Sequence, residues 1–178
     1  MKKIFYVNLV IFPILTSAVV QPGILDFTFV KNCITYSDNT LTDELNKKGF
    51  SLLNNTTEDR YYSNQVEREN TVNVDGSISF GSSEIAVHRY LLGEKNTVRS
   101  IGIHFSPSED SIYIKNFLRI EKSIIKSSTF QKEFYSSKFQ TVIKKYVDAA
   151  GVFYYIYWDT GFGCIMLAKH RIDELYFS

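Results

Sequence analysis

Two cysteines and three histidines could act as nucleophiles, proton acceptors or metal ligands: Cys33, Cys164, His88, His104 and His170. A cysteine nucleophile needs a histidine within reach to take its proton, and no recognised nucleophile signature surrounds either cysteine. His88 and His104 could meet across a hairpin, but the histidines stand singly, without an HExxH, His-x-His or CxxC pattern. The sequence therefore predicts no metal site and no cofactor.

One triplet, Asp159-Thr160-Gly161, follows the apolar residues Ile156-Tyr157-Trp158. It resembles the active-site triplet of the aspartic proteases, in which two such carboxylates share a proton. The chain has no second Asp-Thr-Gly or Asp-Ser-Gly, and Phe162 stands where that family has a small residue. Asp and Gly are also favoured in a turn between two strands. We therefore predict no catalytic residue and keep a hydrolase that uses Asp159 or a cysteine as the alternative.

The first residues have the order of a secretory signal peptide. Lys2 and Lys3 form a short basic start, residues 4–15 are almost uninterruptedly apolar, and Thr16-Ser17-Ala18 supplies small residues for cleavage. The competing interpretation is an uncleaved membrane anchor, although the apolar stretch barely reaches the ~17 residues that span a bilayer. We expect residues 1–18 to be removed and residues 19–178 to form one periplasmic or secreted domain. Membrane contact would come only through an uncleaved N-terminal segment.

Export would place the two cysteines in an oxidising compartment, where disulfides are favoured. Cys33 and Cys164 both lie outside the signal segment and allow a single intramolecular connectivity. We predict that they are paired, which would tie the N-terminal strand region to the last hairpin. Two buried thiols that act as small apolar side chains are the alternative.

Composition excludes some functional classes and permits a globular core. The 178 residues include 20 Lys and Arg against 19 Asp and Glu, a net charge of +1, so a nucleic-acid binder is not expected. Hydrophobic residues make up 44% and aromatic residues 15% of the chain, which is enough apolar material for one domain of this length.

Hairpins and helices alternate along the chain. We predict one α+β domain in which an antiparallel sheet built from hairpins packs against two main helices, at about 109–126 and 129–150. The second helix rests on apolar residues at helical spacing, from Phe130 and Phe134 to Val147 and Ala150. We also expect an extended segment over 23–36, where Leu25, Phe27 and Phe29 alternate, and a helix over 40–48, which has Asp43 and Glu44 early, Lys47 and Lys48 late and Gly49 as its stop. A strand over 50–53 and a polar loop over 54–70 follow. Three hairpins are expected: one over 72–80 with a three-residue turn at Asp75-Gly76, which would place Val72 opposite Phe80, and two over 84–105 and 152–169.

The segment from Val152 to Trp158 is apolar on both faces of its predicted strand. Such a strand is either central in the sheet and covered on both sides, or it presents an aromatic face to a partner. The excess of Tyr and Phe is of the kind that protein interfaces use. The candidate partner-binding residues are Tyr155, Tyr157 and Trp158 in this strand and Tyr61 and Tyr62 in the polar loop, with core packing as the alternative for all five.

In the absence of a catalytic constellation, the sequence favours binding over catalysis. We expect an exported protein-binding domain that blocks another protein, such as a secreted toxin or an envelope enzyme, in the manner of an immunity protein or an enzyme inhibitor. A structural envelope component, anchored by an uncleaved N-terminus, is a further alternative beside the hydrolase.

Overall fold

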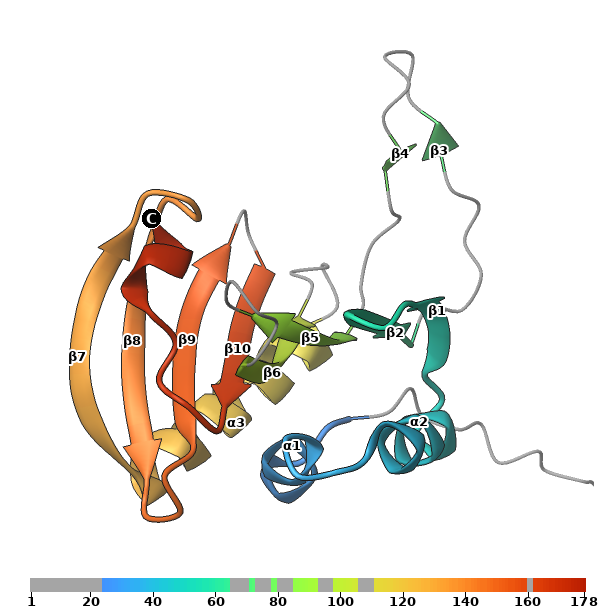
Figure 1. Cartoon of the computed structure of the whole chain (residues 1–178), viewed down its shortest axis with the longest axis horizontal. Helices are drawn as coiled ribbons and strands as arrows, with labels where there is room; N and C mark the ends of the chain where they lie inside the picture. Colours follow the sequence, from blue (N-terminus) through green and yellow to red (C-terminus); the bar gives the residue numbers. More distant parts are fainter. Residues whose placement is uncertain are drawn as a thin grey trace, which may run out of the picture.

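The computed structural model describes residues 24–64, 71–72, 78–79, 85–92, 98–105, 111–159 and 162–178. The predicted signal segment, residues 1–18, lies outside the described residues. Eight strands form one antiparallel sheet (Figure 1) in the order β1-β2-β5-β6-β10-β9-β8-β7. Their bounds, in that order, are Ser51–Asn55, Asp59–Ser63, Ile85–Leu92, Val98–Phe105, Phe162–Ala168, Phe153–Asp159, Thr141–Asp148 and Ser128–Ser136.

Among the described residues, three α-helices pack on one face of this sheet: α1 Phe27–Cys33, α2 Asp38–Lys47 and α3 Ser111–Ser127. The short 3-10 helix η1, Glu174–Phe177, lies against the opposite face (Figure 1). The arrangement confirms the predicted α+β fold built from hairpins. None of the described helices is both long and apolar enough to cross a membrane.

The two faces of the sheet carry two separate cores, because successive side chains of a strand point to opposite faces. In β9, Tyr154 and Ile156 belong to the core under the helices, called here the helix-side core. Tyr155 and Tyr157 belong to the core on the other face, which includes Phe177 and is called here the η1-side core. Since β9 lies between β10 and β8 and is buried on both faces, the apolar segment is a central strand.

The predicted helix over 129–150 is wrong, because this segment forms the β7–β8 hairpin. A β-bulge between Phe130 and Lys132 explains the misleading pattern. It places Phe130 beside Tyr146 on the helix side and Phe134 beside Ile143 on the η1 side. Two apolar residues four apart therefore lie on opposite faces of the sheet, although their spacing is that of one helix face.

The predicted extended segment over 23–36 is also wrong, because it contains α1. The Asp26 carboxylate caps this helix by accepting a hydrogen bond of 2.8 Å from the Phe29 amide, which satisfies a helix N-terminal donor. The buried residues Phe29, Val30 and Cys33 follow helical spacing. The alternation of Leu25, Phe27 and Phe29 that suggested a strand is therefore not the pattern of burial.

Two smaller expectations also need correction. The polar stretch 54–70 is not a loop throughout, because it contains β2, which pairs with β1 across a turn closed by hydrogen bonds between Thr56 and Asp59. The hairpin over 72–80 forms as β3 Thr71–Val72 and β4 Ile78–Ser79. Its predicted register is wrong, because Val72 lies opposite Ile78 and not opposite Phe80. This pair is a sheet of its own, so burial in the main core does not impose the three-residue turn.

The remaining elements confirm their predictions. The helix over 40–48 is α2, capped by Ser37 and followed by Gly49 at φ 82°, and the helix over 109–126 is α3. The hairpins over 84–105 and 152–169 are β5–β6 and β9–β10.

The predicted disulfide is not formed in the structure, where Cys33 and Cys164 are both buried thiols. Cys33 lies in the helix-side core and Cys164 in the η1-side core. The sheet separates the two sulfur atoms, so they do not come within bonding range. Burial also raises the pKa of the Cys33 thiol to about 12, and the thiol acts as a small apolar side chain.

The buried carboxylate of Asp148 ties the β8–β9 turn to α1. It accepts hydrogen bonds from the amides of Ala150 and Val152 at 2.9 and 3.0 Å and from the Tyr154 hydroxyl at 3.1 Å. The Lys31 ammonium lies 2.9 Å away. Burial alone would raise the pKa of Asp148, but the hydrogen bonds from Lys31, Val152 and Tyr154 outweigh it and hold the pKa below 3.8.

We predict that Asp148→Asn destabilises the fold by about 1–3 kcal/mol at neutral pH, because charge-assisted hydrogen bonds and an ion pair are lost. Since the folded-state pKa is depressed, this contribution is present above pH 3.8 and disappears as the pH falls through the folded pKa. Urea unfolding at neutral and acidic pH measures the difference. The exposed Asp43→Asn is the control, and an equal loss in both variants would contradict the assignment.

Candidate functional site

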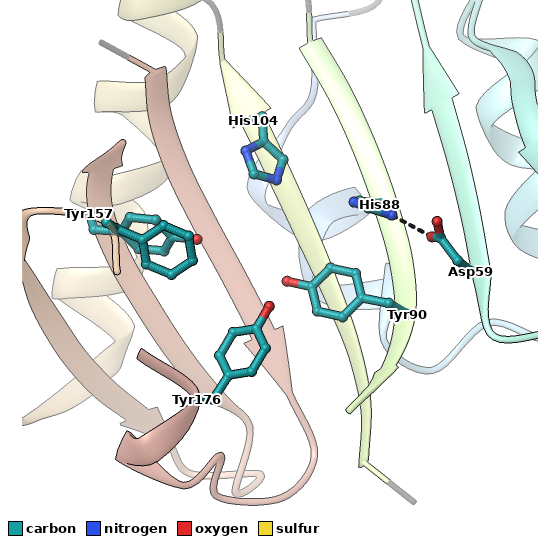
Figure 2. Close-up of a pocket in the computed structure, with 7 residues that line it drawn as sticks. Asp59, His88, Tyr90, His104, Tyr157 and Tyr176 are labelled. Atoms are coloured by element: carbon teal, nitrogen blue, oxygen red, sulfur yellow. Dashed lines mark ion pairs between the residues drawn. The ribbon is translucent and has the colours of Figure 1, made fainter. Parts of the chain in front are cut away.

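A pocket of about 320 Å³ opens on the η1 side of the sheet (Figure 2). We call it the tyrosine–histidine pocket. Strands β2, β5, β6 and β9, the β7–β8 turn and η1 supply its lining. The lining residues are Asp59, His88, Tyr90, His104, Phe139, Tyr157 and Tyr176.

Strand register brings these side chains together from distant parts of the chain. One row across four strands runs Tyr157–Cys164–His104–Ala86. The next runs Tyr155–Met166–Gly102–His88–Tyr61. Because alternate residues of a strand share a face, His88 with Tyr90, and Gly102 with His104, point to the same side.

Gly102 lets the Tyr90 ring and the His104 imidazole lie close to the backbone of β6 beside the pocket. A Cβ at this position would lie 3.1 Å from the Tyr90 hydroxyl oxygen and 3.3 Å from Nε2 of His104. Both distances are shorter than ordinary contacts to a side-chain carbon, so the Tyr90 ring and the imidazole can approach only over a glycine. Gly102 therefore lies beneath Tyr90 and His104, two residues of the lining, and this position is called here the floor of the pocket.

At the rim of the pocket, His88 and Asp59 contact each other through Nε2 and Oδ1 (Figure 2). Each side chain is about one-third exposed. The imidazole also makes edge contacts with the rings of Tyr61 and Tyr90, at centroid distances of 5.5 and 4.9 Å. These contacts on both sides hold the His88 ring in one orientation.

Three phenol groups from different elements converge on the pocket (Figure 2): Tyr90 of β5, Tyr157 of β9 and Tyr176 of η1. The hydroxyls of Tyr90 and Tyr176 hydrogen-bond to each other. Burial is the main cause that raises the pKa of both groups, that of Tyr90 well above its usual value. Tyr90 and Tyr176 therefore remain protonated and uncharged at neutral pH.

His104 contacts Cys164 behind the pocket wall, with 3.3 Å between Nδ1 and Sγ. Burial, and to a lesser extent the charge of neighbouring His88, lowers the pKa of His104 to about 4, so the imidazole is neutral at neutral pH. Its Nε2 faces the floor over Gly102, where it donates or accepts a hydrogen bond according to the tautomer. Cys164 is 1% exposed and lies behind His104.

The five candidate partner-binding residues, four tyrosines and Trp158, do not lie on one surface. Tyr157 lines the pocket, and Tyr61 lies beside it against His88. Tyr62 and Tyr155 are fully buried; their hydroxyls bond to Thr42 and to the Ile172 amide. Trp158 is 41% exposed and packs against Phe117 on the helix side. Core packing therefore accounts for Tyr62 and Tyr155.

Sequence reasoning missed Asp59, Tyr90 and Tyr176 as lining residues of a common pocket. A partial signal was present in the hairpin over 84–105, where His88 and His104 were seen to be able to meet. Gly102 faces His88 in the register of this hairpin, and a glycine within a strand indicates close approach of other groups. Of the Asp159-Thr160-Gly161 triplet, Asp159 ends β9, and its side chain and the other two residues lie outside the described part.

Within the described ranges, no group of three His, Cys, Asp or Glu side chains is placed to hold a metal ion. Comparison with known proteins gave no match to a protein family, to a curated protein or to a solved structure. The pocket therefore has to be interpreted from its own geometry and chemistry.

We predict that His104 stays neutral until the pH approaches about 4. Between pH 6.5 and about 4, the unfolded chain takes up a proton at this residue and the folded chain does not, so stability falls as the pH is lowered. NMR titration of the imidazole carbons, assigned with His104→Gln, measures the pKa. Titration of His104 near 6.5 would contradict the buried environment described here.

Proposed function

We propose that this chain is a binding protein rather than an enzyme and that the tyrosine–histidine pocket is its recognition site. The observation that carries the proposal is a pocket on which the buried phenol of Tyr157, two half-buried phenols and a neutral imidazole converge, with Tyr90 and His104 packed closely over Gly102. A concave site with aromatic walls and a few convergent polar groups is typical of ligand recognition.

The position of the thiol favours binding over covalent catalysis. A thiol attacks as the thiolate, which is stabilised by a protonated histidine. Burial disfavours the protonated form of His104, and Cys164 lies behind the imidazole rather than in the lining. A ligand in the pocket would meet Nε2 of His104 before it met the sulfur atom.

We propose further that the partner is another protein, in keeping with an exported domain that blocks a toxin or an enzyme. A volume of about 320 Å³ is at the lower end of the range of about 300–1,000 Å³ for ligand pockets. It fits one group that projects from a partner. Tyr61, beside the rim, would contact the surface from which that group projects.

Variants of the pocket floor test this proposal. Gly102→Val should abolish partner binding, because its side chain would displace the Tyr90 ring and the His104 imidazole. Tyr90→Phe keeps the ring and should weaken binding by about three- to tenfold through the loss of one hydroxyl. Affinity capture from envelope extracts with the full chain, quantified by mass spectrometry, compares these variants with the wild type.

Tyr135→Phe is the matched control, because Tyr135 is 65% exposed and lies on the helix side, opposite Val142. A partner retained by this control and by the wild type, but lost with Gly102→Val and depleted with Tyr90→Phe, would support the proposal. Equal retention by all four proteins would reject the pocket as the recognition site.

The hydrolase alternative keeps one specific observation in its favour, the 3.3 Å contact between Cys164 Sγ and His104 Nδ1. It predicts hydrolysis of activated esters that disappears in Cys164→Ala and persists in Cys33→Ala, since Cys33 lies in the other core. If binding is the function, any hydrolysis is the same in the wild type and both variants. Initial rates with a chromogenic ester, measured on variants with native circular dichroism, separate the two proposals.

A further inference from the structure

We infer that the tyrosine–histidine pocket binds an uncharged, hydroxyl-rich ligand of the size of one hexose. The inference rests on the proposed function and specifies the group that a partner would insert. Its ligand is a neutral sugar unit, either free or displayed on a glycoprotein.

The charges around the pocket favour neither an anion nor a cation. Asp59, the carboxylate of the lining, already contacts His88. The Lys138 ammonium lies 4.1 Å from the Tyr176 ring centroid and donates to the Tyr176 carbonyl at 3.3 Å. At neutral pH, His104 supplies no charge to bind an anion. A buried cation would lose its hydration without gaining an unshared carboxylate.

The polar groups of the lining are instead suited to hydroxyls. The hydroxyls of Tyr90 and Tyr176 bond to each other, which leaves lone pairs on both oxygens and one of the two O–H groups for a ligand, and Nε2 of the neutral His104 either donates or accepts. A carboxylate ligand offers only acceptors, and an ammonium offers only donors. A sugar hydroxyl both donates and accepts, so it can bond to each of these groups whichever role that group takes.

The walls and the volume also fit one sugar ring. Phe139 stacks on Tyr157 at a centroid distance of 5.1 Å, and both line the pocket, which supplies apolar surface for the C–H groups of a pyranose. About 320 Å³ is small among ligand pockets. Because Gly102 has no Cβ, the Tyr90 hydroxyl and His104 Nε2 lie close together over it, so that one sugar ring can contact both groups.

A panel of sugars tests the ligand class. Full-length protein with 13C-labelled tyrosine and histidine is titrated with glucose, galactose, mannose and N-acetylglucosamine, and with the charged counterparts glucosamine and glucuronic acid. We expect at least one neutral sugar to shift the signals of Tyr90, Tyr157, Tyr176 and His104. The neutral sugar should bind about tenfold or more tightly than its charged counterparts. A charged group would leave at least one polar group without a hydrogen-bond partner, which costs about that factor in affinity.

Two variants and one control locate the binding. Tyr90→Phe should weaken the neutral sugar by about three- to tenfold, and Gly102→Val should abolish its binding. Tyr135→Phe, on the opposite face of the sheet, should leave the affinity unchanged. If Gly102→Val fails to fold, the ratio between Tyr90→Phe and Tyr135→Phe decides the result, and a ratio of one overturns the inference.

The source of the sugar is tested with a glycoprotein that carries neutral mannose glycans and with the same protein after removal of its glycans. Binding that disappears with the glycans indicates a displayed sugar, whereas binding of the monosaccharide alone indicates a free one; both support the inference. If only the charged counterparts or the deglycosylated protein shift the NMR signals of the pocket residues, the ligand is not a neutral sugar. That outcome would overturn the ligand class and leave the proposed binding function standing. No shift with any probe overturns the sugar, while the capture experiment decides the binding function separately.

Discussion

The pairing of β6 with β10 is the interaction on which the rest of the structure depends. Six residue pairs, from Ser100–Ala168 to Phe105–Gly163, join the hairpin β5–β6 to the C-terminal hairpin β9–β10. Both cores extend across this junction, since each contains residues from the two sides. Both rows of the pocket cross it as well, and the contact between His104 and Cys164 is made directly over it. Without this pairing, the chain would have two groups of hairpins and no shared face.

Burial has different consequences on the two faces of the sheet. Under the helices, it produces an apolar core in which Asp148 keeps its charge because Lys31 and three hydrogen-bond donors surround the carboxylate. On the η1 side, no unshared charge compensates for the burial of His104 and Tyr90. Burial therefore lowers the pKa of His104 and raises that of Tyr90, and both groups stay uncharged at neutral pH. Polar groups are tolerated there because they bond to one another. The same physical effect thus makes one face a structural core and leaves the other with an uncharged, hydrogen-bonding pocket.

Local signals were sufficient for much of the fold. Capping and charge placement predicted α2, and alternation with turn residues predicted β5–β6 and β9–β10. Two predictions failed for identifiable reasons. The bulge between Phe130 and Lys132 gave a hairpin the spacing of a helix, and the alternation of Leu25, Phe27 and Phe29 concealed α1, which Asp26 caps. For the site, Tyr157 was named as a candidate, and it was noted that His88 and His104 could meet across a hairpin; both line the pocket. Tyr176 and Asp59 could not be connected with them, because Tyr176 lies in η1 and Asp59 in β2, far apart in the chain.

The sequence by itself determined the class of structure: a neutral globular domain with enough aromatic residues for a core, a sheet assembled from hairpins, and no recognised catalytic constellation. These properties depend on composition and on contacts between residues close in the chain, which local patterns record. Only the tertiary structure decided that Cys33 and Cys164 lie on opposite faces, that Tyr155 is core while Tyr157 lines a pocket, and that Tyr90 and His104 pack over Gly102. Those outcomes depend on the register between β6 and β10 and on which face the helices cover. That register is selected by burial across the whole sheet, for which no single segment of the chain carries the information.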